Sequence, residues 1–271
     1  MFHLGKVYET FISDSALYYF DQALLCAQST NDSIKITLPR LGKVKCYAIL
    51  GYFKEGCTEL ARIESNGIPD EVQLEWFDTN RQLYSYMATY AKDNKELFSY
   101  YLKLLNKFRD LQIQALNSDS HEYKLFLAEH YASENQTTKA KLLFSELIEE
   151  IPSNSNIYAR AAHNMATIKK FEKQEDVAAY YMALAAISDI KCSVKETMAI
   201  QDLAIYLYNT GDISRAYNYI SSSLADAVFC NARLRTAEVS KIIPLIDGTY
   251  KEQLNQQQKT LILTNLFIGI L

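Results

Sequence analysis

The feature that most constrains the fold is a spacing pattern that occurs three times between residues 127 and 224. In each copy a large apolar residue precedes an alanine, a second alanine follows twelve positions later, and a large apolar residue comes four positions after that. The alanine pairs are Ala128 with Ala140, Ala166 with Ala178, and Ala204 with Ala216. Small residues at both points let two helices approach closely, while the large ones fill the space between neighbouring pairs. The pattern therefore predicts stacked helix hairpins, an architecture typical of binding scaffolds rather than catalysts.

This spacing is typical of the tetratricopeptide repeat. One such hairpin cannot bury its own apolar face, so several must stack. The chain has 271 residues, 49% of them apolar, and only eight Gly and four Pro, which favours long helices over many short strands. We therefore expect an all-α, right-handed superhelix of about six tetratricopeptide-like hairpins with a C-terminal capping helix.

Turn and capping residues predict where the hairpins begin and end. Asp14 or Ser15 is suited to cap the second helix. The second hairpin is expected to turn at Gly51 and to end at Asn66–Gly67. Pro69 is suited to open the next helix, because its missing N–H is not needed in a first turn. The remaining expected elements are helices over 69–92 and 95–116 and hairpins over 119–150, 154–190 and 195–227.

The chain changes character after residue 227. Residues 228–250 suit the atypical cap that a repeat array needs, and Pro244 is expected to kink or restart a helix there. Residues 251–259 are polar and rich in Gln. We therefore predict two parts, a repeat array with its cap over residues 1–250 and a polar linker helix running into an apolar segment over residues 251–271.

The last eleven residues, 261–271, are apolar on all faces of a helix. Eleven residues cannot span a bilayer, which needs about 20. The polar lead-in ending at Lys259 suits a helix that enters a membrane interface. We expect this segment to be the beginning of a truncated membrane helix, and the alternative is a terminal helix folded back on the array.

No residue pattern indicates catalysis, a metal site or a cofactor. The four His, at positions 3, 121, 130 and 163, form no HExxH pair, and the five Cys form no CxxC pair. The sequence contains no P-loop, GxGxxG or GxSxG motif. A net charge of −4 without a basic run argues against nucleic-acid binding in this region. We therefore predict a protein that is not an enzyme, with no catalytic residues, no metal and no cofactor.

A ligand of such an array is expected on its concave face, which the first helix of each hairpin lines. Arg160 and His163 lie one helical turn apart and suit contact with an anion or a hydroxyl. The alternative is an ordinary solvated face. The expected ligand is a protein, a peptide or an oligosaccharide. The candidate residues are Glu122, Glu129, Arg160, His163, Gln201, Tyr208 and Asn209.

Two segments carry a resemblance to a known family. Residues 203–262, LAIYLYNTGDISRAYNYISSSLADAVFCNARLRTAEVSKIIPLIDGTYKEQLNQQQKTLI, resemble the end of the sensor region in tetratricopeptide-containing membrane regulators of gut Bacteroidetes. The starch-utilisation-system regulator is the best-known relative of that type. Within them, Cys230–Arg235 and Ile243–Ile246 are similar to the segment that joins array to membrane helix, and Asp14–Ala27 is similar to an early repeat.

The resemblance implies an extracytoplasmic array, a membrane helix and a cytoplasmic coiled coil with a DNA-binding end. It implies that this chain is the sensor alone, on the periplasmic side of the inner membrane, with dimerisation through a C-terminal part that the chain lacks. We therefore expect a non-catalytic sensor of a membrane-anchored transcriptional regulator linked to carbohydrate utilisation. The alternatives are a soluble cytoplasmic adaptor that binds a peptide or protein and, less favoured without a lipid-acceptor Cys near the N-terminus, a glycan-capturing lipoprotein.

Overall fold

The computed structural model describes residues 1–30, 32–65, 67–195 and 198–270. This part of the chain consists of thirteen α-helices and one 3-10 turn, with no strand. The predicted all-α fold is therefore confirmed. The right-handed twist of the superhelix stays a prediction.

The first twelve helices form six hairpins, as the sequence predicts. The second helix of each of the first five hairpins also contacts the first helix of the next one, so the hairpins stack in chain order. The hairpins are α1 (Phe2–Tyr8) with α2 (Ser13–Gln28), α3 (Ser33–Leu50) with α4 (Phe53–Ser65), α5 (Gln73–Tyr90) with α6 (Lys95–Ala115), α7 (His121–Ser133) with α8 (Thr137–Glu150), α9 (Asn156–Phe171) with α10 (Glu175–Lys191), and α11 (Ala199–Asn209) with α12 (Ile213–Phe229). A thirteenth helix, α13 (Arg233–Ile270), follows.

The alanine spacing has the packing role expected of it. Ala128 and Ala140 are fully buried in the core of the fourth hairpin, with Phe144 beside them. Ala204 and Ala216 are equally buried in the last hairpin. Because a side chain larger than alanine would push the paired helices apart, these positions fix the short distance between them.

Several predicted boundaries need correction. Asp14 and Ser15 do not cap α2, because the helix already begins at Ser13 and follows Ile12 without a side-chain cap. Pro69 precedes a 3-10 turn, Asp70–Val72, and the α-helix starts only at Gln73. Gly51 ends α3 in the left-handed conformation, at φ 74°, as predicted. The second hairpin was expected to end at Asn66–Gly67, and Asn66 lies outside the described residues.

Helix α13 continues through Pro244 instead of restarting there. Proline removes one backbone N–H and leaves the carbonyl of Ser240 without its helical partner. Both residues are exposed, so water can satisfy that carbonyl. The proposed division at residue 250 stays a prediction, and α13 crosses it without a break.

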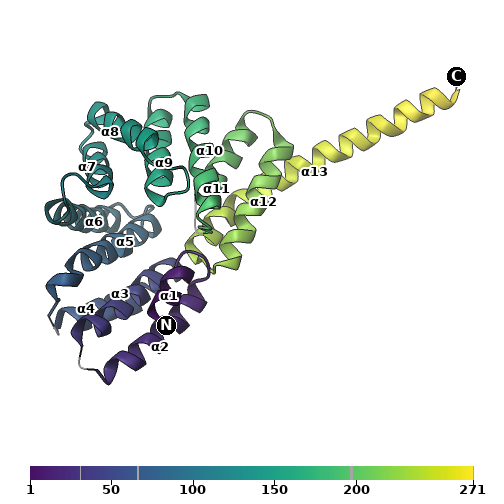
Figure 1. Ribbon diagram of the computed structural model, residues 1–271. Helices are drawn as coiled ribbons and strands as arrows, with labels where there is room; N and C mark the ends of the chain where they lie inside the picture. The colour runs from purple at the N-terminus through teal and green to yellow at the C-terminus, as the bar shows by residue number, and fades with distance from the viewer. Residues whose placement is uncertain (31, 66, 196–197, 271) are drawn as a thin grey trace.

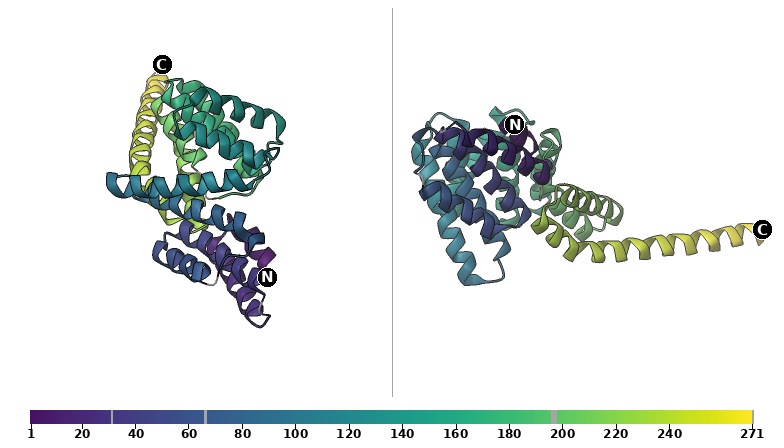
Figure 2. Two further views of the ribbon diagram at one scale, coloured as in Figure 1. Left: turned by 90° about the vertical axis from the view of Figure 1, so that its left-hand side faces the viewer. Right: turned by 90° about the horizontal axis from the view of Figure 1, so that it is seen from below.

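The six hairpins form an arc whose two ends meet, and α13 then extends away from the arc as a long rod (Figures 1 and 2). Ile49 of α3 shares a buried cluster with Cys230 and Ala232, which connect α12 to α13. The guanidinium of Arg233 lies 4.6 Å from the ring centroid of Tyr52, and its Nη2 donates to the Tyr52 hydroxyl at 2.7 Å. The array is therefore closed by contacts between its second hairpin and the junction of α12 with α13.

The far half of α13 extends away from the hairpins (Figure 1). All residues from 251 to 270 are exposed, including Phe267 and Ile270 of the apolar segment. Leu271, the last residue of the expected membrane stub, lies outside the described residues. Within the described chain, no helix has the length and the apolar character needed to cross a membrane.

Candidate functional site

The closed arc surrounds a central cavity of about 590 Å³. Glu9 and Ile49 from the first two hairpins line it together with Arg235 from the first turn of α13. The rest of the wall comes mainly from α5, α6, α7 and α9, with Asp189 of α10, Val194 and Met198 as further lining residues. Most of the lining side chains are polar or charged. The volume lies within the range of small-molecule sites, about 300–1,000 Å³. The closure of the array therefore creates a polar site of ligand size.

Three of the seven predicted site residues meet in this wall. Glu129, Arg160 and His163 all line the cavity. Arg160 Nη2 donates to Glu129 Oε1 at 2.7 Å, and Asn164 Nδ2 donates to the same oxygen at 3.3 Å. His163 Nε2 lies 3.5 Å from Asp202 Oδ2. The predicted pairing of Arg160 and His163 on one face is thus present, and each side chain has a carboxylate partner.

The other four predicted residues do not line the cavity. Glu122 and Asn209 are exposed outside it, and Gln201 is buried within α11. The Tyr208 hydroxyl lies 3.3 Å from that of Thr249 in α13. Helix α13 packs against the last hairpin, so a position that faces the cavity in earlier hairpins is covered there.

Two arginines of the wall share one aromatic ring. The Arg81 guanidinium lies 5.0 Å from the ring centroid of Phe126, and the Arg160 guanidinium lies 4.9 Å from it. Phe126 is itself buried. Cation–π contact at both sites ties α5, α7 and α9 together and fixes where the guanidinium groups point.

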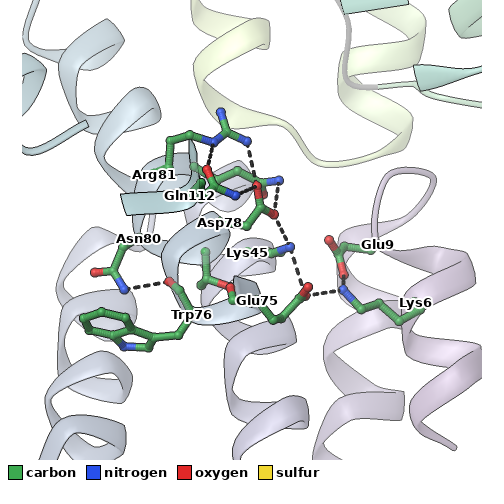
Figure 3. Close-up of polar contacts among 11 residues, drawn as sticks. Lys6, Glu9, Lys45, Glu75, Trp76, Asp78, Asn80, Arg81 and Gln112 are labelled. Carbon is green, nitrogen blue, oxygen red and sulfur yellow. Dashed lines mark hydrogen bonds and ion pairs between the residues drawn. The ribbon is translucent and has the colours of Figure 1, made fainter. Parts of the chain in front are cut away.

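A chain of ion pairs runs from the cavity wall into the N-terminal hairpins (Figure 3). Arg81 Nη2 lies 2.7 Å from Asp78 Oδ1, and Lys45 Nζ lies 2.6 Å from Asp78 Oδ2. Lys45 Nζ also lies 3.0 Å from Glu75 Oε1, which receives Lys6 Nζ at 2.7 Å. The network therefore joins α1, α3 and α5, and a hydrogen bond from Arg81 Nε to Gln112 Oε1 extends it to α6.

The buried pair at the centre of this network is held in its charged form. Burial alone would lower the pKa of Lys45, but Asp78, Glu9 and Glu75 raise it above its ordinary value. Burial alone would raise the pKa of Asp78, but Lys45 and Arg81 hold it far below its usual range. Each charge thus depends on the others, and the network acts as a rigid support for Arg81 in the wall.

Sequence reasoning missed Arg81 and Arg109, which also line the cavity. Both lie in the α5–α6 hairpin, which lacks the alanine spacing, so no repeat register identifies their inward faces. The sequence places Arg235 only in a segment that resembles the regulator family. Its position in the cavity wall could not be predicted, because it depends on closure of the array. Among the described residues, no three His, Cys, Asp or Glu side chains are grouped as a metal ion would require.

A comparison with protein families matches residues 1–241 to the model described as the SusR N-terminal TPR domain. The match covers all six hairpins and the first turns of α13. No curated protein matches the chain.

Proposed function

Because the chain belongs to the family of SusR N-terminal TPR domains and carries the helical-repeat domain of a SusR-type regulator, we propose that it is the ligand-sensing domain of a membrane-anchored transcriptional regulator. In this proposal the domain is extracytoplasmic, performs no catalysis and binds its ligand in the central cavity. The observation that carries the proposal is that both ends of the array and the first turn of α13 line that one cavity.

The lining favours a small polyhydroxylated ligand, an oligosaccharide linked to carbohydrate utilisation. Arg160, Asn164 and Asn156 offer donors, and Glu129 and Asn164 offer acceptors around one hollow. Such groups fix the orientation of sugar hydroxyls, whereas a peptide would need apolar pockets for its side chains. The surrounding repeats also limit the length of ligand that the cavity can hold.

Occupancy of the cavity would be communicated through α13. Arg235 lines the cavity, and its Nη1 lies 2.7 Å from Glu238 Oε2 one turn further along the helix. Glu238 Oε1 in turn lies 3.2 Å from Lys92 Nζ, just after α5. A ligand that contacts Arg235 would therefore bias the position of the helix that leaves the array, as a two-state sensor requires.

The exposed apolar residues at the end of α13 support the proposed anchoring. Leu263, Phe267 and Ile270 are among seven large apolar side chains of this segment that face solvent. A contiguous apolar surface of this kind marks a membrane or protein contact.

The test is a binding measurement with the whole chain by titration calorimetry against a panel of starch-, cellulose-, xylan- and pectin-derived trisaccharides. We expect one class of trisaccharide to bind. The double substitution Arg160→Ala/His163→Ala should weaken its binding by about 1–3 kcal/mol if either side chain makes a buried hydrogen bond to the ligand. Circular dichroism would verify that the variant is folded.

The matched control is Glu122→Ala/Asn209→Ala, because both residues are exposed outside the cavity. This control should bind like the unmodified chain. Normal binding by the Arg160/His163 variant, together with loss of binding in the control, would place the ligand elsewhere and refute the cavity as the sensing site.

A further inference from the structure

Arg109 of α6 is a buried cation in the cavity wall that makes no ion pair within the described chain. Its side chain is 5% exposed. Nη2 donates to Asn106 Oδ1 at 2.9 Å and to Ser133 Oγ at 2.7 Å, and Nη1 donates to the backbone oxygen of Glu129 at 3.3 Å. All three acceptors are neutral. Nε has no hydrogen-bond partner among the described residues.

Two carboxylates near Arg109, those of Glu129 and Asp110, already have other partners. The Glu129 carboxylate receives Arg160 at 2.7 Å. Asp110 Oδ1 lies 3.0 Å from His130 Nδ1. Burial lowers the pKa of Arg109 and the positive charge of Arg81 lowers it further, whereas the carboxylates of Glu129, Asp110 and Glu134 act against this from beyond ion-pair distance. A guanidinium nevertheless stays protonated in proteins, so the charge of Arg109 remains.

The other arginines of the wall show what Arg109 lacks. Arg81 pairs with Asp78, Arg160 with Glu129, and Arg235 with Glu238, each at 2.7 Å. Each of these three therefore brings its own counter-charge. Of these four arginines, Arg109 is the one without an ion pair among the described residues.

A buried charge without a counter-charge destabilises the folded state, and folded proteins usually offset this by pairing the charge. Neutral acceptors only solvate the guanidinium, and no described carboxylate lies within ion-pair distance of it, so an oxyanion bound in the cavity would supply the direct counter-charge that Arg109 lacks. We propose that the ligand of the central cavity carries an oxyanion, a carboxylate or a phosphate ester, that pairs with Arg109. This inference rests on the proposed function, because it concerns the same cavity, and it narrows the ligand to an acidic or phosphorylated saccharide.

The test exploits Asn106, whose amide oxygen already accepts from Arg109. Asn106→Asp keeps the shape of the side chain and supplies a carboxylate at this place. The melting temperature of the whole chain is measured at constant ionic strength with glucose, glucuronate, glucose 6-phosphate and inorganic phosphate. We expect the oxyanions to raise the melting temperature more than glucose does.

In Asn106→Asp the extra shift from oxyanions should disappear, and the melting temperature without ligand should rise by a few degrees. Arg109→Gln should also remove the extra shift. Arg215→Gln changes an exposed arginine of α12 that pairs with Asp212, so it should respond like the unmodified chain. A shift with glucuronate would identify a carboxylate as the group that pairs with Arg109. A shift with glucose 6-phosphate would identify a phosphate ester. A shift with inorganic phosphate would show that the site binds an anion without a sugar.

Three results would overturn the inference: no shift with any oxyanion, equal shifts with glucose and the oxyanions, or an oxyanion response that persists in Asn106→Asp. The proposed sensing function would still hold after any of these results, provided that the unmodified chain binds a sugar and the Arg160→Ala/His163→Ala variant does not. Conversely, a response to inorganic phosphate without any saccharide binding would retain the anion site and refute saccharide sensing.

Discussion

The ring of Phe20 is fully buried between the backbones of Gly5 in α1 and Gly42 in α3. A Cβ atom added to Gly5 would lie 2.5 Å from Phe20 Cε1, and one added to Gly42 would meet the end of the same ring. Neither glycine has a positive φ, so both are needed for close approach rather than for backbone conformation. This single ring therefore fixes how the first two hairpins pack.

We predict that Gly42→Ala lowers the free energy of unfolding by about 1–3 kcal/mol, because the buried ring has no free space to move into. Urea denaturation measures this change. Gly248→Ala is the control, since nothing lies within 4 Å of the added carbon there. That control should be neutral or stabilise the helix by up to about 1 kcal/mol. An unchanged or higher stability of Gly42→Ala would contradict the packing described for Phe20.

The charged network around Lys45 gives the fold a specific pH dependence. The folded-state pKa values of Asp78 and Glu75 lie below their ordinary values. Their contribution to stability is therefore complete above the unfolded-state values, about pH 4, and is lost as the pH falls below them. The pKa of Lys45 is raised, so its contribution is complete below about pH 10.4 and is lost above it.

We predict that the unmodified chain loses more unfolding free energy between pH 7 and pH 3 than Lys45→Met/Asp78→Leu does. The double variant replaces the buried pair by apolar residues of similar size, but it also leaves Arg81 without its carboxylate. We therefore expect it to be less stable than the unmodified chain at pH 7 and less sensitive to pH. Urea denaturation at both pH values measures the difference. Equal losses of unfolding free energy in the two proteins would show that Lys45 and Asp78 do not contribute to the pH dependence of stability.

At the scale of single elements, α13 has two halves with different surroundings. Val239 and Ile246 are fully buried against the last hairpin, whereas every residue from 251 to 270 is exposed. The first half belongs to the core of the array, and the second half does not contribute to it.

We predict that removing residues 260–271 leaves the melting temperature nearly unchanged and reduces self-association, because the deletion removes an exposed apolar surface. Thermal unfolding and light scattering coupled to size-exclusion chromatography measure the two effects. A drop of many degrees would mean that the segment packs on the array and would argue against the membrane stub.

The hairpins from residue 119 onward could be predicted closely because the alanine spacing marks their contact points. Expected boundaries of 119–150, 154–190 and 195–227 lie near the observed helices. The α5–α6 hairpin has no such marker, which is why Arg81 and Arg109 were not identified. Tyr208 was misplaced for a different reason: its contact with Thr249 depends on where a distant helix packs. Local spacing predicts elements, but it does not reveal which of their faces another element covers.

At the scale of the whole molecule, closure of the array depends on a small interface. Ala232 is 1% exposed and packs with Ile49 and Cys230. Outside this cluster, the ends are joined by contacts such as Phe11 with Phe229, whose ring centroids lie 5.4 Å apart. The cavity is intact only while these contacts hold, because residues of both ends line it.

We predict that Ala232→Arg opens the arc, because a long charged side chain cannot be accommodated in a buried apolar cluster. Small-angle X-ray scattering should show an increased radius of gyration, while circular dichroism shows unchanged helix content. Ala225→Arg is the matched control, since Ala225 is exposed on α12. An unchanged radius in Ala232→Arg would show that closure does not depend on this cluster.

The meeting of the two ends also has a consequence for folding. Repeat arrays are stabilised by neighbour contacts, and an end repeat has only one neighbour, so open arrays fray from their termini. Here Asn231 donates to Asp14 across 217 positions of the chain, and each terminal hairpin protects the other. Closing so long a loop has an entropic cost and slows the last step of folding. Once closed, the six hairpins should unfold as a single cooperative unit, with the amides of the first and last repeats exchanging as slowly as those in the middle.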